Sequence, residues 1–252
     1  MKIAVCVKQV VTRETQVRVN SEGTWIRDEA ASWALNEPDA YALEEALRLK
    51  ERHGGEVIAV SAGPARVAQV LRESLARGAD RAIHVEGTDL AAADAAVTAR
   101  ALASALGDEK VDLILTGLQS DDQGFAQVGV VLAERLAMAH STIIMNIEVA
   151  DGRLRVKREL EGGWFQWVTL PLPAVLTIQS GINQLRYATL KGIMAAKKKE
   201  LRVVPAPVAQ APTTRIVSVY VPEKAKKTRL ISGAPAEAAA ELVRALRDDR
   251  AI

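Results

Sequence analysis

The sequence is poor in the residues that crosslink a chain or bind metal ions. It contains a single cysteine, Cys6, among 252 residues. One thiol cannot form a disulfide within the chain or a multi-thiolate metal site, and such usage is typical of a reducing compartment. The three histidines, His53, His84 and His140, lie far apart and match no metal-ligand spacing. We therefore expect no metal site and a cytoplasmic location.

A strong charge of one sign and long hydrophobic runs are also missing. Lys and Arg together number 33, against 31 Asp and Glu, whereas general polyanion binders have a larger basic excess. No unbroken apolar stretch reaches the roughly 18 residues of a membrane span. The apolar run after Lys2 ends at Lys8, too early for a signal peptide. We expect neither a nucleic-acid partner nor membrane insertion.

The sequence offers no persuasive catalytic constellation. Cys6 lies within a predicted buried strand and has no histidine nearby, so a small apolar filler explains it better than a nucleophile does. Asp121 and Asp122 could bind a divalent ion, but two adjacent side chains in a loop are weak evidence. We therefore predict no catalytic residue.

Short apolar runs alternate with amphipathic segments over the first two thirds of the chain. The predicted strands cover residues 2–7, 56–61, 81–85 and 111–115, and the predicted helices cover residues 36–50, 64–78, 91–106 and 125–137. Continuously apolar strands that alternate with helices indicate a parallel sheet covered on both faces. We predict an α/β fold with a mostly parallel sheet.

The pattern changes after His140. Four further strands are predicted over residues 142–149, 153–159, 164–170 and 174–177. The Asp151-Gly152 and Gly162-Gly163 pairs between them are hairpin signals. An antiparallel extension is therefore expected to follow the parallel core.

The end of the chain is predicted to form an arm. Residues 203–214 contain three prolines and no helical or strand period, which is typical of a linker. A short strand is expected over residues 216–221, and an amphipathic helix begins at Pro235. Its apolar face must be buried either on the chain's own core or on another subunit, and the pattern leaves this choice open.

A glycine-containing loop, residues 117–129, follows a predicted buried strand and opens a helix. This places it at the carboxyl edge of the sheet, where open α/β sheets bind ligands. Gly124 permits close backbone approach, and the first amides of the helix lack intrahelical partners, so an anion such as phosphate fits there. The loop matches neither a P-loop nor a GxGxxG motif, and a plain capped helix start is the alternative interpretation.

Residues 181–200 combine apolar side chains with a lysine-rich end. Their spacing alone favours a solvated helix whose lysines complement the helix dipole. The alternative is that Leu190 is an exposed apolar anchor and that the lysines attract acidic partners.

Several segments resemble electron-transfer flavoprotein beta subunits. The resemblance is carried by VKREL and LPAVLTIQSGINQLRYATLKGIMAAKKKE, and in order before them by KIAVCVKQV, NEPDAYALEEALRLKE, EVIAVSAGPA and GADRAIHVE. It covers residues 1–201. It implies a Rossmann-like, adenine-nucleotide-binding core over residues 1–200, with a recognition loop at 178–200, and a linker and helical arm over residues 201–252 that packs on an alpha subunit holding most of the redox FAD.

The resemblance also implies site residues. In AMP-binding members the nucleotide would contact Cys6, Asn36, Glu37, Pro38, Asp39, Ala62, Gly117, Leu118, Gln119, Ser120, Asp121, Asp122, Gln123, Gly124, Phe125, Ala126, Gln127 and Val128. Leu190 matches the anchor that docks dehydrogenases, together with Lys191, Ile193, Met194 and Lys197. Lysines near Lys197 match positions that are methylated in some members.

Two positions depart from the typical family pattern. AMP-binding members carry Asn-Gln-Thr-Gly where this chain has Ala126-Gln127-Val128-Gly129, a form that resembles members holding a second FAD for electron bifurcation. Arg13 replaces an aromatic that neighbours the partner's flavin in some members. A guanidinium there would favour an anionic reduced flavin.

The resemblance implies an electron carrier that performs no bond chemistry itself. It would pass electrons from flavin dehydrogenases to a quinone reductase or another acceptor. One alternative is the beta subunit of a bifurcating flavoprotein that holds a second FAD and oxidises NADH. An alternative of another class is a stand-alone adenine-nucleotide-binding sensor, against which the tethered terminal helix argues.

Overall fold

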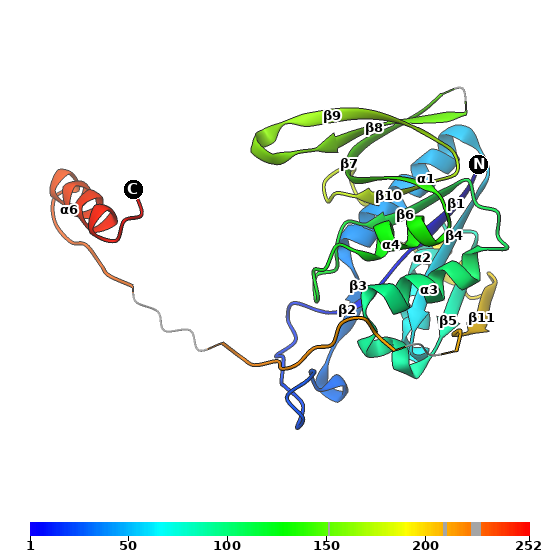
Figure 1. Ribbon diagram of the computed structural model, residues 1–252, viewed down its shortest axis with the longest axis horizontal. Helices are drawn as coiled ribbons and strands as arrows, with labels where there is room; N and C mark the ends of the chain where they lie inside the picture. Colours follow the sequence, from blue (N-terminus) through cyan, green and yellow to red (C-terminus); the bar gives the residue numbers. More distant parts are fainter. Residues whose placement is uncertain (151, 209–210, 223–227) are drawn as a thin grey trace.

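Nine strands form one sheet at the centre of the structure, a computed structural model that describes residues 1–150, 152–208, 211–222 and 228–252 (Figure 1). The strands are β1 (Lys2–Cys6), β4 (Glu56–Gly63), β5 (Arg81–Glu86), β6 (Leu113–Gly117), β7 (Ala139–Ala150), β8 (Arg153–Glu159), β9 (Phe165–Pro171), β10 (Ala174–Ile178) and β11 (Leu201–Pro205). Their order is β11-β5-β4-β1-β6-β10-β7-β8-β9. All pairings from β11 to β7 are parallel, which confirms the predicted α/β class.

Helices cover both faces of this sheet. Those packed on it are α1 (Glu37–His53) and α2 (Ala68–Arg77) on one face, and α3 (Ala95–Leu106) and α4 (Val128–Arg135) on the other. The chain also forms α5 (Leu190–Ala196) and α6 (Pro235–Asp248), with short 3-10 helices at Asp28–Ala30, Ala65–Val67, Thr88–Ala92 and Glu161–Gly163. Because strand side chains alternate, Ile3 and Val5 of β1 pack with α1 and α2, while Ala4 and Cys6 pack with α3 and α4. The continuously apolar sequence of β1 follows from burial on both faces.

The antiparallel extension is confirmed for three of its four predicted strands. β7, β8 and β9 pair in antiparallel fashion. The fourth prediction was wrong in its placement, because β10 returns to the core and lies parallel between β6 and β7. Every residue of β10 is buried, as an interior strand requires. Asp151 of the predicted hairpin lies outside the described residues.

The tail differs from the sequence prediction at two points. The expected linker begins with a strand, since β11 pairs with β5 along the sheet edge, where its Pro205 is tolerated. Residues 216–221, predicted as a strand, form none. The terminal helix α6 is confirmed, and Figure 1 shows it standing apart from the sheet. Among the described residues of α6 none is buried.

A small two-stranded ribbon escaped prediction. β2 (Gln9–Val11) pairs antiparallel with β3 (Trp33–Leu35). Both strands are too short to show a period, so their pairing depends on the surrounding chain. The ribbon continues the path of β1 beyond the sheet and leads into α1.

Candidate functional site

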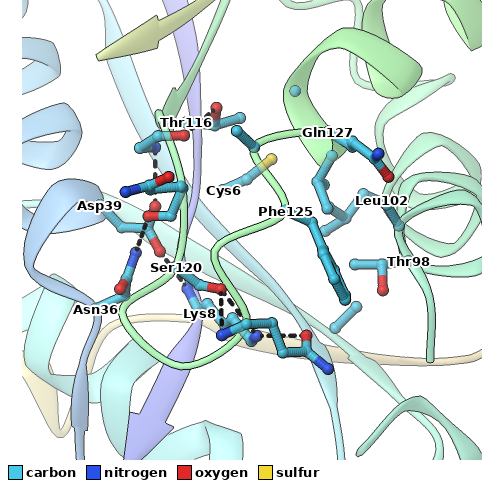
Figure 2. Close-up of a pocket in the computed structure, with 18 of the residues that line it drawn as sticks. Cys6, Lys8, Asn36, Asp39, Thr98, Leu102, Thr116, Ser120, Phe125 and Gln127 are labelled. Atoms are coloured by element: carbon cyan, nitrogen blue, oxygen red, sulfur yellow. Dashed lines mark hydrogen bonds between the residues drawn. The ribbon is translucent and has the colours of Figure 1, made fainter. Parts of the chain in front are cut away.

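The main pocket lies where the parallel strands end and the sheet order reverses. β1 is first in the chain, and its neighbours β4 and β6 lie on opposite sides of it. The connections therefore diverge at the carboxyl end of β1, which is where open α/β sheets bind ligands. The pocket is lined from the ends of β1, β4 and β6, from the loop after β6, and from α3 (Figure 2).

Most of the nucleotide-contact residues named from the sequence converge here. Those that line the pocket are Cys6, Asn36, Asp39, Ala62, Gly117, Leu118, Gln119, Ser120, Gln123, Phe125, Ala126, Gln127 and Val128. Those outside its lining are Glu37, Pro38, Asp121, Asp122 and Gly124. The strand ends and the loop after β6 therefore form one continuous wall.

The opposite wall was missed by sequence reasoning. It comes from the segment after β5 and from the first turns of α3, and consists of Leu90, Ala91, Ala93, Ala95, Thr98 and Leu102. In Figure 2 the ring of Phe125 points toward Thr98. A signal was available, because β5 is a parallel strand and the helix after it must begin at the same edge of the sheet. Its small and apolar side chains would suit a flat, weakly polar ligand group.

A buried carboxylate holds the pocket floor together. Asp39, at the start of α1, accepts hydrogen bonds from the backbone N–H of Lys8 at 2.8 Å and of Gly117 at 2.8 Å, and so joins the ends of β1 and β6. Burial raises the pKa of Asp39 to about 6, although these amide donors act in the opposite direction. A Cβ at Gly117 would lie only 2.7 Å from Cβ of Pro38, so only glycine permits this approach.

Asn36 connects the loop after β6 to the same helix start. Its Nδ2 donates to the carbonyl oxygen of Gln119 at 3.1 Å, and its Oδ1 accepts from the N–H of Asp121 at 2.9 Å. Both ends of the amide are thus engaged within the chain. The contribution of Asn36 to the pocket is to shape the loop.

Lys8 closes the lower end of this loop. Its Nζ contacts Asp122 Oδ1 at 2.7 Å, Gln123 Oε1 at 2.9 Å and Ser120 Oγ at 3.3 Å (Figure 2). Burial opposes ionisation of Asp122, but the Lys8 ammonium outweighs it and holds the pKa of that carboxyl below its usual range. The pair Asp121-Asp122 is therefore part of a loop anchor, with Lys8 as its cation.

The helix after the loop begins later than its sequence predicted. Helix was expected from Phe125, but α4 starts at Val128, because Gly124 (φ +65°) and Ala126 (φ +54°) are left-handed. The Gln127 side chain makes no capping hydrogen bond, so the first amides of α4 have no side-chain cap. Gly129 presses this end against the sheet, since a Cβ there would lie 2.6 Å from Cγ2 of Thr177. The result is a fixed helix N-terminus at the pocket wall, suited to an anion.

Ala126 is in a conformation that favours other residues. A left-handed alanine is disfavoured by roughly 1–2 kcal/mol, part of which glycine's greater chain entropy offsets. We expect Ala126→Gly to raise the free energy of unfolding by about 1 kcal/mol, as measured by urea denaturation. The same exchange in mid-helix, Ala103→Gly in α3, should lower it by about 1 kcal/mol. Destabilisation by both exchanges would show that Ala126 carries no backbone strain.

A second hollow adjoins the pocket. The two share Lys8, Ala62, Leu90, Ala91, Gln123 and Phe125. Arg13 lines the outer hollow, where its guanidinium lies 3.1 Å from Glu37 Oε2 and 3.9 Å from Asp121 Oδ2. Gln9 Oε1 and Arg66 Nε are buried on this side and have no hydrogen-bond partner among the described residues.

The loop at 178–200 forms a separate feature. A long helix over residues 181–200 was the prediction that spacing favoured, but only α5 is helical, capped by Thr189 Oγ1 accepting from Gly192 N. Four apolar side chains protrude here and are called the apolar tip: Tyr187 (85% exposed), Leu190 (84%), Ile193 (44%) and Met194 (63%). Lys191 and Lys197 are also exposed. The structure therefore presents Leu190 as an exposed apolar side chain.

Cys6 and His84, two possible reactive groups in the sequence, are both buried within the fold. Cys6 is buried in β1, and burial raises the pKa of its thiol, which disfavours the thiolate. His84 is buried, with Nε2 3.0 Å from the carbonyl oxygen of Gly63. Within the described residues no cluster of three or more His, Cys, Asp or Glu side chains is placed to bind a metal ion. Over the same part of the chain no helix has the length and apolar character of a membrane span.

Comparison of the chain with known proteins identifies the family to which it belongs. Residues 24–209 match the family description "Electron transfer flavoprotein domain". The chain is 36% identical to the electron transfer flavoprotein subunit beta of Methylophilus methylotrophus, with 98% of each chain covered. It is 35% identical to the subunits of the same name from Bacillus subtilis (94% and 95% covered) and Homo sapiens (98% and 97%). Similarity of this extent places the chain in the electron transfer flavoprotein beta-subunit family.

Proposed function

We propose that the chain is the beta subunit of a cytoplasmic, heterodimeric electron carrier and binds AMP as a structural ligand in the main pocket. An alpha subunit holds most of a redox-active FAD, whose site the beta chain completes. Electrons pass from flavin dehydrogenases, through this flavin, to a quinone reductase or another acceptor. The observation that carries the proposal is the uncapped start of α4 beside a pocket at the reversal point of the sheet.

The donor set fits an adenylate group. The polar side chains at the strand ends, Asn36, Asp39 and Lys8, are engaged within the chain itself. A ligand would therefore be held chiefly by backbone amides from the loop and the first turn of α4, against small and apolar walls. An anionic phosphate suits the amides, and a purine suits the walls. Bound in this way, AMP would strengthen the fold and take no part in electron transfer.

A second FAD in place of AMP is favoured by two observations. The run Ala126-Gln127-Val128-Gly129 lacks the asparagine and threonine of typical AMP-binding relatives. The outer hollow also shares a wall with the pocket, so a ligand longer than a mononucleotide could extend from one into the other. In that case the subunit would belong to a bifurcating flavoprotein with NADH as donor.

Nucleotide extraction from the purified heterodimer tests the proposal. We expect acid-released nucleotides, separated by chromatography, to contain one FAD and one AMP per heterodimer. Two FAD and no AMP would establish the bifurcating alternative. A heterodimer without any nucleotide beyond the alpha-subunit FAD would contradict a nucleotide site in this chain.

The helical arm supports a partner rather than a stand-alone sensor. α6 buries none of its side chains, although Leu242 and Val243 lie on its apolar side. We propose that the arm, beyond the residues of β11, packs on the alpha subunit. The chain expressed alone should then self-associate or expose the arm to proteases, as measured by light scattering and limited proteolysis. A compact, protease-resistant monomer would favour the sensor.

Leu190 is the proposed anchor for electron donors. Truncation of such an anchor commonly weakens binding by about 2 kcal/mol, or roughly 30-fold. We expect Leu190→Ala to slow reduction of the heterodimer by a flavin dehydrogenase to about this extent under subsaturating conditions, measured by stopped-flow absorbance, with flavin content unchanged. Leu160→Ala, at an exposed leucine outside both the arm and this loop, is the matched control. Equal rates for the two variants would refute docking through Leu190.

A further inference from the structure

The apolar tip stands on a segment that has no regular structure of its own. Residues 184–189, which lead into α5, form neither helix nor strand. Tyr187 and Leu190 are more than four-fifths exposed, so their side chains contribute little packing that could hold the segment in place. Exposed apolar groups on an unanchored loop would instead fold back onto the protein surface. The position of the tip must therefore be set by contacts elsewhere in the loop.

Arg186 makes two such contacts, each a bidentate salt bridge. Its guanidinium contacts Glu44 through Nε at 2.7 Å and Nη2 at 3.2 Å, and Glu51 through Nη1 at 2.6 Å and Nη2 at 3.2 Å. The backbone N–H of Arg186 also donates to Glu44 Oε2 at 3.3 Å. Both carboxylates belong to α1, a rigid element of the core. Bidentate arginine pairs fix orientation as well as position.

Burial makes the pair with Glu44 stronger than a surface ion pair. The Glu44 side chain is only 4% exposed. Burial opposes its ionisation, but Arg186 and Arg48 outweigh that effect and hold the pKa of Glu44 below its usual range. Arg48 also donates to the carbonyl oxygen of Gln184 at 2.8 Å, which fixes the backbone two residues before Arg186. The two arginines and Glu44 thus secure one end of the loop to α1.

The other end of the loop is secured to α2. Arg72 donates to the carbonyl oxygens of Ala196 at 2.8 Å and Lys199 at 2.9 Å. Lys199 Nζ donates to the carbonyl oxygen of Leu75 at 3.1 Å. Gly192 permits α5 to lie against α2, since a Cβ there would overlap the carbonyl oxygen of Ala76. The tip therefore lies between two fixed points, and Arg186 is the last side chain that secures the loop before it.

We infer that Arg186 is a positioning residue for the apolar tip, holding the loop on α1 so that Leu190 meets an incoming dehydrogenase already in its docking position. This inference rests on the proposed docking role of Leu190. A preorganised loop loses less conformational freedom on binding than a mobile one, so association is tighter. Arg186 itself need not touch the partner.

Two substitutions separate geometry from charge. Arg186→Gln removes both ion pairs and one positive charge. Arg186→Lys keeps the charge but cannot make two bidentate pairs. Arg155→Gln, which removes an exposed arginine of β8 that pairs with Glu148 of β7, is the charge-matched control. All variants are made in the full heterodimer, and Glu51→Gln provides a milder loss of the same contact should either Arg186 variant fail to assemble.

Two measurements then decide the inference. Hydrogen exchange should be at least 10-fold faster over residues 182–189 in Arg186→Gln, and intermediate in Arg186→Lys, with no change in Arg155→Gln. Reduction by a flavin dehydrogenase that reduces the wild-type heterodimer should slow about 10-fold in Arg186→Gln, with flavin content unchanged. In the double variant with Leu190→Ala the two losses should be less than additive, because both act on the same contact.

The failures of the two proposals are distinguishable. If Leu190→Ala slows reduction but Arg186→Gln changes neither exchange nor rate, the positioning role is overturned and docking stands. Faster exchange without slower reduction also overturns it, because a mobile loop would then dock equally well. If neither Leu190→Ala nor Arg186→Gln slows reduction, docking at this loop fails. Equal slowing by Arg155→Gln and Arg186→Gln would assign the effect to net charge.

Discussion

Replacing Asp94 with alanine is expected to lower the free energy of unfolding by about 3 kcal/mol and to release the C-terminal arm at Thr213 and Thr214. One carboxylate oxygen caps α3 by accepting from the N–H of Val97 at 2.8 Å. The other accepts from Thr213 N at 2.6 Å, Thr213 Oγ1 at 2.7 Å and Thr214 N at 3.0 Å. A single buried side chain therefore joins the pocket wall to the tail.

The pH dependence at this site follows from its ionisation. Burial opposes the charged form, but the four donors outweigh it and lower the pKa of Asp94 to about 2, from 3.8. The folded-state pKa is thus depressed, so the stabilisation is present above about pH 4 and is lost as the pH falls toward 2. Asp94→Ala should show no such loss in this window.

Urea denaturation and limited proteolysis measure the two effects of Asp94→Ala. Asp89→Ala, at an exposed acidic residue in the preceding 3-10 helix, is the control and should change neither. Thr213→Val removes one donor and leaves the helix cap, so it should accelerate cleavage of the tail with a smaller loss of stability. Wild-type protease resistance in Asp94→Ala would show that the tail is held by other contacts.

The second large effect is expected at Asp39, with the opposite dependence on pH. Its folded-state pKa of about 6 lies above the ordinary value of 3.8. The stabilisation associated with this group is therefore fully present below about pH 4 and is lost as the pH rises through 6. The shift corresponds to about 3 kcal/mol across that window. At neutral pH the ionised carboxylate of Asp39 still joins the Lys8 and Gly117 amides.

Asp39→Asn isolates this titration, because an amide keeps one acceptor and carries no charge. Between pH 3 and 7 the free energy of unfolding of the wild type should fall relative to that of Asp39→Asn by about 3 kcal/mol. Urea denaturation at several pH values measures the difference between the two proteins. The control is Asp121→Asn, at a neighbouring loop carboxylate whose backbone, but not side chain, bonds Asn36. Parallel curves for wild type and Asp39→Asn would contradict a raised pKa.

The parallel core could be predicted because several of its strands contain an unbroken apolar run, a pattern that indicates burial on both faces of the sheet. Runs such as Ile3-Ala4-Val5-Cys6 are apolar on both sides, and helices between them show one apolar face. The placement of β10 could not be predicted in this way, since its sequence says that it is buried but not which strands it lies between. β11 was obscured by Pro205, which only an edge strand accommodates.

The location of the candidate site could be predicted from the sequence, but the role of each side chain in it could not. Loop geometry placed a ligand at the carboxyl edge, and the structure brings the strand ends together there. The sequence could not show that the side chains of Asn36 and Asp39 form hydrogen bonds with backbone groups of the chain itself. Nor could it show the left-handed Ala126, because alanine normally continues a helix, and this displaced the start of α4.

The edge strand β11 is also placed to resist a pulling force on the C-terminal tail. It begins at Leu201, directly after the loop that carries Leu190, and Arg202 contacts Glu109 while the strand pairs with β5 as far as Pro205. Tension applied to the tail would run along β11 and load its hydrogen bonds to β5 in shear, so that they would have to break together. A pull on the tail would therefore be resisted at β11 before it reached the loop that carries Leu190.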